Sequence, residues 1–207
     1  MSSTVFTIGH SDHTLEAFLA LLRMHAISAI ADVRSAPYSR RQAQFNREPL
    51  QTALGEAGIH YVFLGRECGA RSDDPACYEG AQVQYERLAR TDAFQTGLQR
   101  IRAGAQRFRL ALMCAEREPL SCHRTILVSR NLVGQGLEVH HILADGGLES
   151  QTDALRRLRR QLGMQQPDLF CGEAELDALA YRQQAARIAY VQTDTAGSPA
   201  SPQESKP

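Results

Sequence analysis

Short apolar runs of strand length alternate along this chain with longer helical patterns, and this alternation restricts its fold more than any other feature. Five of the runs are bounded by polar or glycine-containing segments, as strands are; they span residues 5–8, 27–33, 60–64, 109–114 and 138–143. Strands that alternate with helices favour βαβ crossovers, which produce a parallel sheet with helices on both faces. We therefore expect a single α/β domain built on a mostly parallel, Rossmann-like sheet of about five strands.

The helical patterns lie between these runs and continue after the last of them. The pattern at 15–22 has apolar residues at i, i+3, i+4 and i+7, and another helix is predicted to begin near Pro49 and end before Gly58. Further helices are predicted at residues 83–103 (one or two), 125–133, 152–162 and 173–188. The last two form a helical C-terminal extension. Residues 1–192 are predicted to form the domain, whereas residues 193–207, rich in Thr, Ser, Pro and Gly, are predicted to be disordered.

The charge balance excludes a global electrostatic attraction to nucleic acid or to an anionic membrane. Lys and Arg together number 23, as do Asp and Glu, so the formal net charge is zero. The basic residues are nearly all Arg, which favours bidentate recognition of carboxylate or phosphate where several converge. Five scattered cysteines, with neither a signal peptide nor an apolar run of membrane-spanning length, lead us to expect a cytoplasmic protein with reduced thiols and no membrane partner.

Polar residues follow directly after the predicted strands. In a parallel sheet the carboxyl ends of the strands lie along one edge, and ligands bind in the crevice outside that edge. Residues scattered in the sequence are therefore expected to converge there: His10, Ser11, Asp32, Arg34, Arg66 and Glu116. Arginines of the intervening loops would add a local positive region that suits a phosphate-bearing ligand. These are Arg40, Arg41, Arg47 and Arg71.

The stretch from Leu110 to Arg124 is the strongest indication of a site. An apolar run breaks at Cys114 into a polar, Pro-containing loop. The loop delivers Cys122, His123 and Arg124 to a predicted helix start. Such a start binds anions through its free backbone N–H groups and lowers the pKa of a cysteine placed there. The alternative is a buried Cys122 that caps the helix, with Arg124 in a structural ion pair. Neither cysteine has the Cys-x5-Arg spacing of tyrosine phosphatases, which disfavours their mechanism.

Several motifs at these positions resemble those of one uncharacterised family. They are Thr7-Ile-Gly-His-Ser11, Asp32-Val-Arg34, Leu64-Gly65, Met113-Cys-Ala-Glu116, Cys122-His-Arg124 and Asp145-Gly146. On these motifs the chain is similar, over roughly residues 5–190, to the domain-of-unknown-function family numbered 488. The resemblance implies membership but supplies no activity, because the activity of that family is not established. Cys68-Gly-Ala-Arg71 and Ser150-Gln151 depart from the family pattern, which usually has Leu-Gly-Gly-Arg and Pro-His there.

Proton transfer and nucleophilic attack are assigned to four side chains. A Glu116 carboxylate half-buried beside the site would have a raised pKa and could act as a general acid or base, or else form a salt bridge to an arginine. Asp32 would orient an imidazole or a ligand hydroxyl, or else pin its loop through an arginine. His10 supplies an imidazole and Cys122 a candidate nucleophile. The predicted catalytic residues are therefore Glu116, Asp32, His10 and Cys122.

Eight further residues are predicted to contact the substrate. Arg34, Arg124 and the helix start would hold its anionic group, and Gly9 would let the backbone approach it closely. Ser11 is either a substrate contact or a helix cap. The full set is Gly9, Ser11, Arg34, Arg40, Gly65, Cys114, His123 and Arg124.

The sequence favours a site without metal or cofactor. Two cysteines and two histidines could hold zinc, but the C-x2-C and H-x3-H spacings are missing. Those four residues are His10, Cys114, Cys122 and His123. The dinucleotide fingerprint G-x-G-x-x-G is also missing, which argues against hydride chemistry.

These features predict a hydrolase or group transferase that acts on an anionic, phosphate-bearing substrate, either a nucleotide-like molecule or a product of nucleic acid. One alternative is a non-catalytic module that binds or senses a nucleotide or nucleic acid, with Tyr38, Phe45 and Tyr78 stacking a base. Another is thiol redox chemistry at Cys114 and Cys122, which needs their Cα atoms less than about 7 Å apart. The oligomeric state is not indicated.

Overall fold

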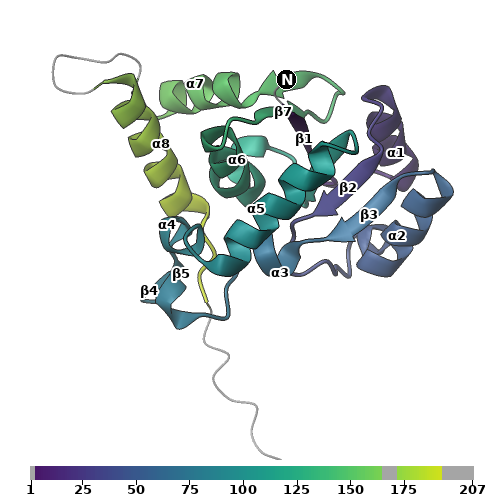
Figure 1. The fold of residues 1–207 in the computed structure, drawn as a ribbon, viewed down its shortest axis with the longest axis horizontal. Helices are drawn as coiled ribbons and strands as arrows, with labels where there is room; N and C mark the ends of the chain where they lie inside the picture. The colour runs from purple at the N-terminus through teal and green to yellow at the C-terminus, as the bar shows by residue number, and fades with distance from the viewer. Residues whose placement is uncertain (1–2, 165–171, 193–207) are drawn as a thin grey trace, which may run out of the picture.

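A six-stranded sheet with the order β3-β2-β6-β1-β7-β8 is the centre of the computed structural model, which describes residues 3–164 and 172–192 (Figure 1). The strands are β1 (Thr4–Gly9), β2 (Ala29–Asp32), β3 (His60–Phe63), β6 (Leu110–Cys114), β7 (Glu138–Ile142) and β8 (Leu148–Ser150). Neighbouring strands are parallel except for β7 and β8. The expected α/β domain with a mostly parallel sheet is confirmed, and each of the five predicted strands is present.

The additional strand, β8, is an antiparallel partner of β7 that the sequence did not indicate. Leu143 N–H donates to the Gly147 carbonyl, and Gly147 N–H donates to the Asp145 carboxylate, both at 2.9 Å. Gly146 adopts a positive φ of 88° within this turn. The strand has three residues, which is too short for a periodic pattern to reveal it.

Different helices cover the two faces of the sheet, because successive side chains of a strand point to opposite sides. Phe6 and Ile8 of β1 belong to one buried cluster with Phe18 of α1 (Leu15–Met24) and Leu54 of α2 (Arg47–Glu56). Val5, from the same strand, belongs to a second and larger cluster. Its helices are α5 (Asp92–Ala105), α6 (Arg130–Gly134), α7 (Gln151–Gln161) and α8 (Glu173–Ile188) (Figure 1).

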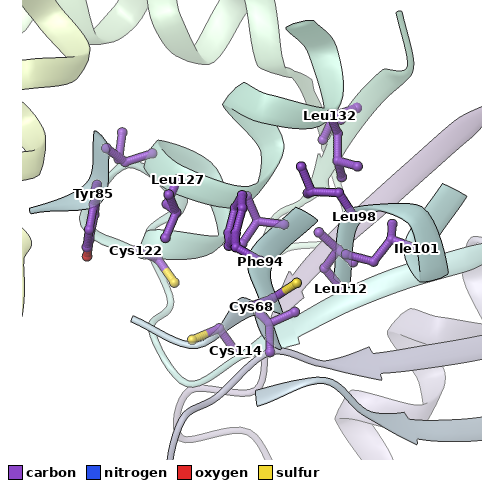
Figure 2. Close-up of a cluster of buried hydrophobic side chains, with 14 of the residues drawn as sticks. Cys68, Tyr85, Phe94, Leu98, Ile101, Leu112, Cys114, Cys122, Leu127 and Leu132 are labelled. Carbon is purple, nitrogen blue, oxygen red and sulfur yellow. The ribbon is translucent and has the colours of Figure 1, made fainter. Parts of the chain in front are cut away.

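The larger cluster ends where the predicted site begins. Figure 2 shows Phe94 and Leu98 of α5 packed close to Leu112 of β6. Cys114 and Cys122 lie at one end of this cluster, on the side of Tyr85. The core therefore fixes the end of β6 and the segment after the loop, which are the two places from which the site cysteines come.

Short elements fill the connections. They are η1 (Ala43–Phe45), α3 (Gly65–Cys68), η2 (Pro75–Cys77), β4 (Tyr78–Glu79), β5 (Gln82–Val83), α4 (Tyr85–Leu88) and η3 (Pro119–Ser121). The stretch expected to hold one or two helices contains two, α4 and α5. The stretch expected to be only a loop contains η2 and the first strand of the β4–β5 hairpin. The Thr14 hydroxyl caps α1 by accepting a hydrogen bond from Ala17 N–H at 3.2 Å.

The segment after His123 is not the α-helix predicted at 125–133. Arg124–Ser129 (η4) is a π-helix, and α-helical geometry starts only with α6. Every residue of η4 is buried, and the Ser129 hydroxyl donates to the Arg124 carbonyl at 2.7 Å. Packing on all sides of the segment, including the long Arg124 side chain, decides this geometry, and π-turns of this kind occur frequently at functional sites.

The C-terminal extension is helical, as predicted, and packs onto the segments that carry the site. Gln151 Nε2, at the start of α7, donates to Tyr181 Oη of α8 at 2.8 Å, and Gln184 Nε2 of α8 donates to the Leu120 carbonyl at 2.8 Å. After α8, the Tyr190 carbonyl accepts a hydrogen bond from Val83 N–H at 2.9 Å. The tail predicted to be disordered lies outside the described residues. Within the described ranges, no helix is long and apolar enough to cross a membrane.

Candidate functional site

Four chemically active side chains converge where β6 ends. The thiols of Cys114 and Cys122 donate to the same carboxylate oxygen, Glu116 Oε2, at 2.8 and 2.9 Å. Their Sγ atoms lie 3.6 and 3.9 Å from Nδ1 of His123. One donor atom of each residue lies within 4.8 Å of those of the other three. We refer to Cys114, Glu116, Cys122 and His123 as the Cys–His–Glu cluster.

The end of β2 holds the His123 ring in one orientation. Nε2–H of His123 donates to the carbonyl oxygen of Val33 at 2.9 Å. In the neutral ring this hydrogen bond places the proton on Nε2 and leaves the lone pair on Nδ1, the nitrogen that faces the two cysteines. The imidazole is therefore oriented to accept a proton from a thiol or to bind an electrophile.

The pKa of each residue in the Cys–His–Glu cluster depends on its neighbours in the cluster. Burial, together with the hydrogen bond and charge of Cys122, raises the pKa of Cys114. Burial also opposes ionisation of Cys122, but its interaction with Cys114 and the positive charge of Arg124 hold its pKa well below the usual value. Burial works against a charged His123, yet its contact with Cys122 raises its pKa. Arg124 and His123 therefore favour the thiolate form of Cys122.

Glu116 lies between the buried part of this cluster and solvent. The residue is exposed as a whole, but its carboxylate points inward at the two thiols. Burial of that end, followed by the charge of Cys122, raises the pKa of the Glu116 carboxyl group. The side chain can therefore meet both the buried cluster and a molecule that enters from solvent.

Arg124 is fully buried, and its guanidinium group binds the main chain of the loop. Nη1 donates to the Glu116 carbonyl at 2.6 Å and Nη2 to the Arg117 carbonyl at 3.3 Å, while Nε donates to Thr7 Oγ1 at 3.4 Å. No described carboxylate forms an ion pair with it. This geometry supports a structural role for Arg124, through main-chain carbonyls and not through the ion pair considered as the alternative, and does not support the predicted substrate contact.

Gly9 and Gly65 pack closely against the main chain of neighbouring segments. A Cβ atom on Gly9 would lie 1.9 Å from the carbonyl oxygen of Glu116, and one on Gly65 would lie 2.0 Å from the carbonyl oxygen of Arg34. No side chain fits at such distances. Both glycines therefore allow close packing of the loops that carry the site, and the close approach of Gly9 to a substrate stays a prediction.

Asp32 and Arg34 form a buried ion pair that pins the end of β2. Arg34 donates from Nε to Oδ1 at 2.9 Å and from Nη2 to Oδ2 at 2.7 Å. Tyr61 Oη also donates to Oδ2 at 2.8 Å. Asp32 is completely buried and Arg34 is 6% exposed. Of the two roles considered for Asp32, this geometry supports the structural one.

His10 is a buried neutral imidazole. Its Nδ1 hydrogen-bonds to the Ser11 carbonyl at 2.9 Å, and its Nε2 accepts from Arg34 Nη1 at 3.2 Å. The ring stacks on Phe45 with centroids 4.4 Å apart. Burial lowers the pKa of His10 to about 4, and the charge of Arg34 adds to this effect. Both ring nitrogens are therefore occupied, which does not support the proton-transfer role expected for His10.

A pocket of about 300 Å³ opens beside the Cys–His–Glu cluster. Arg71, in the loop after α3, lines this pocket and is exposed to solvent. The carbon of its guanidinium group lies 4.3 Å from the centroid of the Tyr190 ring. No described carboxylate pairs with Arg71. Other lining residues include Arg34, Tyr85, Cys114, Glu116, His123 and Tyr190. Tyr190 was not predicted, because main-chain pairing with β5, and no local sequence pattern, places it at this edge.

Two other predicted contacts lie away from the pocket. Arg40 is exposed in the loop after β2, and Ser11 donates from its hydroxyl to Asp12 Oδ1 at 2.9 Å. Neither lines the pocket. Arg66 and Arg47 line a separate depression with Arg100, so the predicted local positive region is divided between two places.

The pattern of a family described as "Domain of unknown function DUF488" matches residues 14–131, more than half of the chain. The chain belongs to the DUF488 family. The matched range includes the whole Cys–His–Glu cluster but ends short of Tyr190. No curated protein matches the chain, and no solved structure does.

In this DUF488 protein the cluster differs from the metal set considered from the sequence. His10 is not part of it, and Glu116 takes the corresponding place. The donors come from a strand end, a loop and the start of a π-helix, so no standard ligand spacing could reveal them. The sulfurs of Cys114 and Cys122 are also within 4.8 Å, so thiol redox chemistry stays a hypothesis.

Proposed function

We propose that this protein is a hydrolase or group transferase that acts on an anionic small molecule in the pocket beside the Cys–His–Glu cluster. One observation carries the proposal: Glu116 and the exposed Arg71 line the same pocket at the carboxyl edge of the parallel sheet. Ligands of open α/β sheets bind outside this edge. In the proposal Arg71 holds the anion, and Glu116 accepts a proton from the attacking hydroxyl or water and returns it to the leaving group.

Arg71 is the arginine best placed for the anion. Arg34 and Arg124 make hydrogen bonds to Asp32 and to main-chain carbonyls, respectively, whereas Arg71 has an exposed guanidinium and no carboxylate partner among the described residues. The Tyr190 ring, whose centroid lies 4.3 Å from the guanidinium carbon, holds the Arg71 guanidinium beside the pocket by a cation–π contact. A phosphate or carboxylate group matches this arrangement.

A small-molecule enzyme fits the site better than a nucleic-acid-binding module. Phe45 is buried against His10, and Tyr78 is also buried, so neither can stack a base. Tyr38 is exposed, but its hydroxyl donates to Glu48, away from the pocket. A sequence-tolerant nucleic-acid surface needs a row of exposed aromatic and basic residues. The described residues provide only the pair Arg71 and Tyr190 at the pocket.

The test combines binding with turnover. Thermal unfolding of the wild type is measured with inorganic phosphate, nucleotides, sugar phosphates, dicarboxylic acids and a short oligonucleotide, and then repeated with Arg71→Gln and the control Arg66→Gln. We expect a small anion to raise the melting temperature of the wild type and the control but not of Arg71→Gln. Ligands that bind are then tested for turnover, which Glu116→Gln should reduce at least about 100-fold if the carboxylate moves a proton. Stabilisation by the oligonucleotide alone, or turnover unaffected by Glu116→Gln, contradicts the proposal.

A further inference from the structure

We propose that Cys114, Glu116, Cys122 and His123 bind one Zn²⁺ ion. The four donors are two thiols, an imidazole and a carboxylate, the ligand types that zinc uses in tetrahedral protein sites. The sulfur donors disfavour the hard ions Mg²⁺ and Ca²⁺, which take oxygen ligands. The proposal shares Glu116 with the reaction proposed above, but it stands on the geometry of the four donor atoms and is tested by metal binding without any turnover.

The distances agree with a tetrahedral site. Zinc–sulfur bonds of about 2.3 Å and zinc–nitrogen bonds of about 2.05 Å place sulfur and nitrogen roughly 3.6 Å apart at a tetrahedral angle. Cys114 Sγ and Cys122 Sγ lie 3.6 and 3.9 Å from Nδ1 of His123. The sulfur–oxygen distances, 2.8 and 2.9 Å, are those of thiols that donate to Glu116. They must lengthen by about 0.6 Å around an ion, and the exposed Glu116 can rotate to allow this.

The orientation of His123 is the second, independent indication. Histidines that bind metals almost always donate their other ring N–H to a carbonyl or carboxylate, which fixes the tautomer. The Val33 carbonyl at the end of β2 accepts this hydrogen bond from Nε2 at 2.9 Å. The free lone pair of Nδ1 consequently points at both cysteines before any ion arrives.

The residues around the cluster suit the net charge that it would carry with Zn²⁺ bound. Two thiolates and a carboxylate carry three negative charges, which would be costly beside a buried core without a cation. Zn²⁺ leaves a net charge of −1, and the buried Arg124 supplies a positive charge that acts on Cys122. Arg124 also holds the main chain of Glu116 and Arg117, so the loop between two of the ligands is fixed in place.

The cluster fits zinc better than a disulfide between its cysteines. A disulfide would use only the two sulfurs, whereas the Glu116 oxygen and the His123 nitrogen also lie within 4.8 Å of them. Glu116 is the one exposed ligand of the four, and it lines the pocket. We infer that Cys114, Cys122 and His123 are the permanent ligands, and that the Glu116 position is the one at which water or a substrate oxygen can exchange.

The experiment uses the full chain, reduced, freed of metal with a chelator and kept under a non-thiol reductant. Zinc is titrated by calorimetry, bound metal is counted by mass spectrometry, and Co²⁺ is added as a spectroscopic substitute. We expect one equivalent of zinc and, with Co²⁺, thiolate-to-metal charge-transfer absorption with the intense visible bands of a tetrahedral site. Cys122→Ser and His123→Gln should each weaken binding by more than the roughly 10–100-fold that loss of a ligand's hydrogen-bond partner costs.

Matched controls separate ligand loss from unfolding. Cys77→Ser changes another buried cysteine, and His25→Gln changes another histidine whose Nε2 hydrogen-bonds to a main-chain carbonyl, that of Gly146 at 2.8 Å. Both should bind zinc like the wild type. Glu116→Gln, at an exposed position, should fold and bind zinc more weakly, with an altered Co²⁺ spectrum. The proposal is overturned if the reduced wild type binds no zinc, if Cys122→Ser binds as tightly as Cys77→Ser, or if the cysteines form a disulfide whose reduction yields no binding. None of these results depends on the substrate.

Discussion

The buried guanidinium group of Arg124 donates a hydrogen bond from Nη1 to the main-chain carbonyl of Glu116 at 2.6 Å. The side chain of Glu116 turns the other way and meets the thiols of Cys114 and Cys122. Glu116 is thus held in place through its main-chain carbonyl, while its carboxylate hydrogen-bonds within the Cys–His–Glu cluster. The conformation of the site loop depends on an arginine that does not face the pocket.

Replacing Arg124 should therefore destabilise the protein. Arg124→Gln leaves the carbonyls of Glu116 and Arg117 without their buried donor, and we expect it to lower the free energy of unfolding by about 2–4 kcal/mol. Urea denaturation followed by circular dichroism measures the change. Arg117→Gln is the control, because that side chain is 62% exposed and should change stability by less than about 0.5 kcal/mol. Equal effects of the two substitutions would contradict the role given to Arg124.

Gly9→Ala should displace the same loop from the other side. The added Cβ would lie 1.9 Å from the Glu116 carbonyl oxygen, which is main chain and cannot move alone. We expect a loss of at least about 3 kcal/mol, or failure to fold. Gly55→Ala, in α2, meets nothing within 4 Å, so it should raise stability by about 0.5 kcal/mol. A Gly9→Ala protein as stable as the wild type would show that this contact is not tight.

The buried Asp32–Arg34 pair should be sensitive to loss of one charge. Asp32→Asn leaves the Arg34 guanidinium buried without its carboxylate, and we expect a loss of about 3–5 kcal/mol. Tyr61→Phe removes one hydrogen bond to the same charged carboxylate and should cost about 2 kcal/mol. Denaturation midpoints of the two variants give the comparison. If Asp32→Asn costs no more than Tyr61→Phe, the ion pair does not pin this strand end.

The protein should lose stability in mild acid because two histidines are buried in the neutral form. Burial lowers the pKa of His10 to about 4 and that of His141 to about 3. Well above pH 6.5 neither the folded nor the unfolded chain binds these protons, so the stabilisation by the neutral histidines is complete. Below about pH 6.5 the unfolded chain binds them first, and the free energy of unfolding falls as the pH falls towards the pKa values of the folded state. At pH 5 each histidine should cost about 2 kcal/mol relative to pH 7.5.

A variant can distinguish the contribution of His141 to the acid dependence from the contributions of other groups. His141→Gln should show a loss of stability between pH 7.5 and pH 5 that is smaller than that of the wild type by about 2 kcal/mol. Substitution of the exposed His60 by Gln should leave the loss unchanged. Urea titrations of the three proteins at both pH values provide the measurement. An identical acid dependence in His141→Gln and the wild type would mean that His141 is protonated in the folded state.

The pattern of apolar residues was sufficient to predict the sheet, because strands of this kind are buried on both faces and appear as continuous apolar runs. It also predicted that the residues after β1, β2 and β6 would meet at one edge. Short elements such as β8 and the β4–β5 hairpin were missed, because two or three residues carry no period. The π-helix η4 was assigned as α-helix, because its geometry follows from burial on every side and not from local preference.

Within the site, the sequence indicated which residues would gather but not what each would contact. Arg34 and Arg124 were expected to bind an anion, yet Arg34 pairs with a carboxylate of this chain and Arg124 hydrogen-bonds to its main-chain carbonyls. Which arginine of a set stays free depends on the path of loops that are distant in sequence. Arg71 has no carboxylate partner among the described residues, and its loop lies beside Tyr190, near the end of the described chain.

The sequence by itself determined the α/β class, the family and the edge of the sheet at which polar residues collect, since all three follow from patterns along the chain. Only the tertiary structure decided that Cys114, Glu116, Cys122 and His123 share one small volume, and that His123 presents Nδ1 to it. The physical reason is that donor distances of a few ångströms depend on how the end of β6, the loop and the π-helix pack. Buried hydrogen bonds from Arg124 and to Val33 fix that packing, and no spacing in the sequence encodes them.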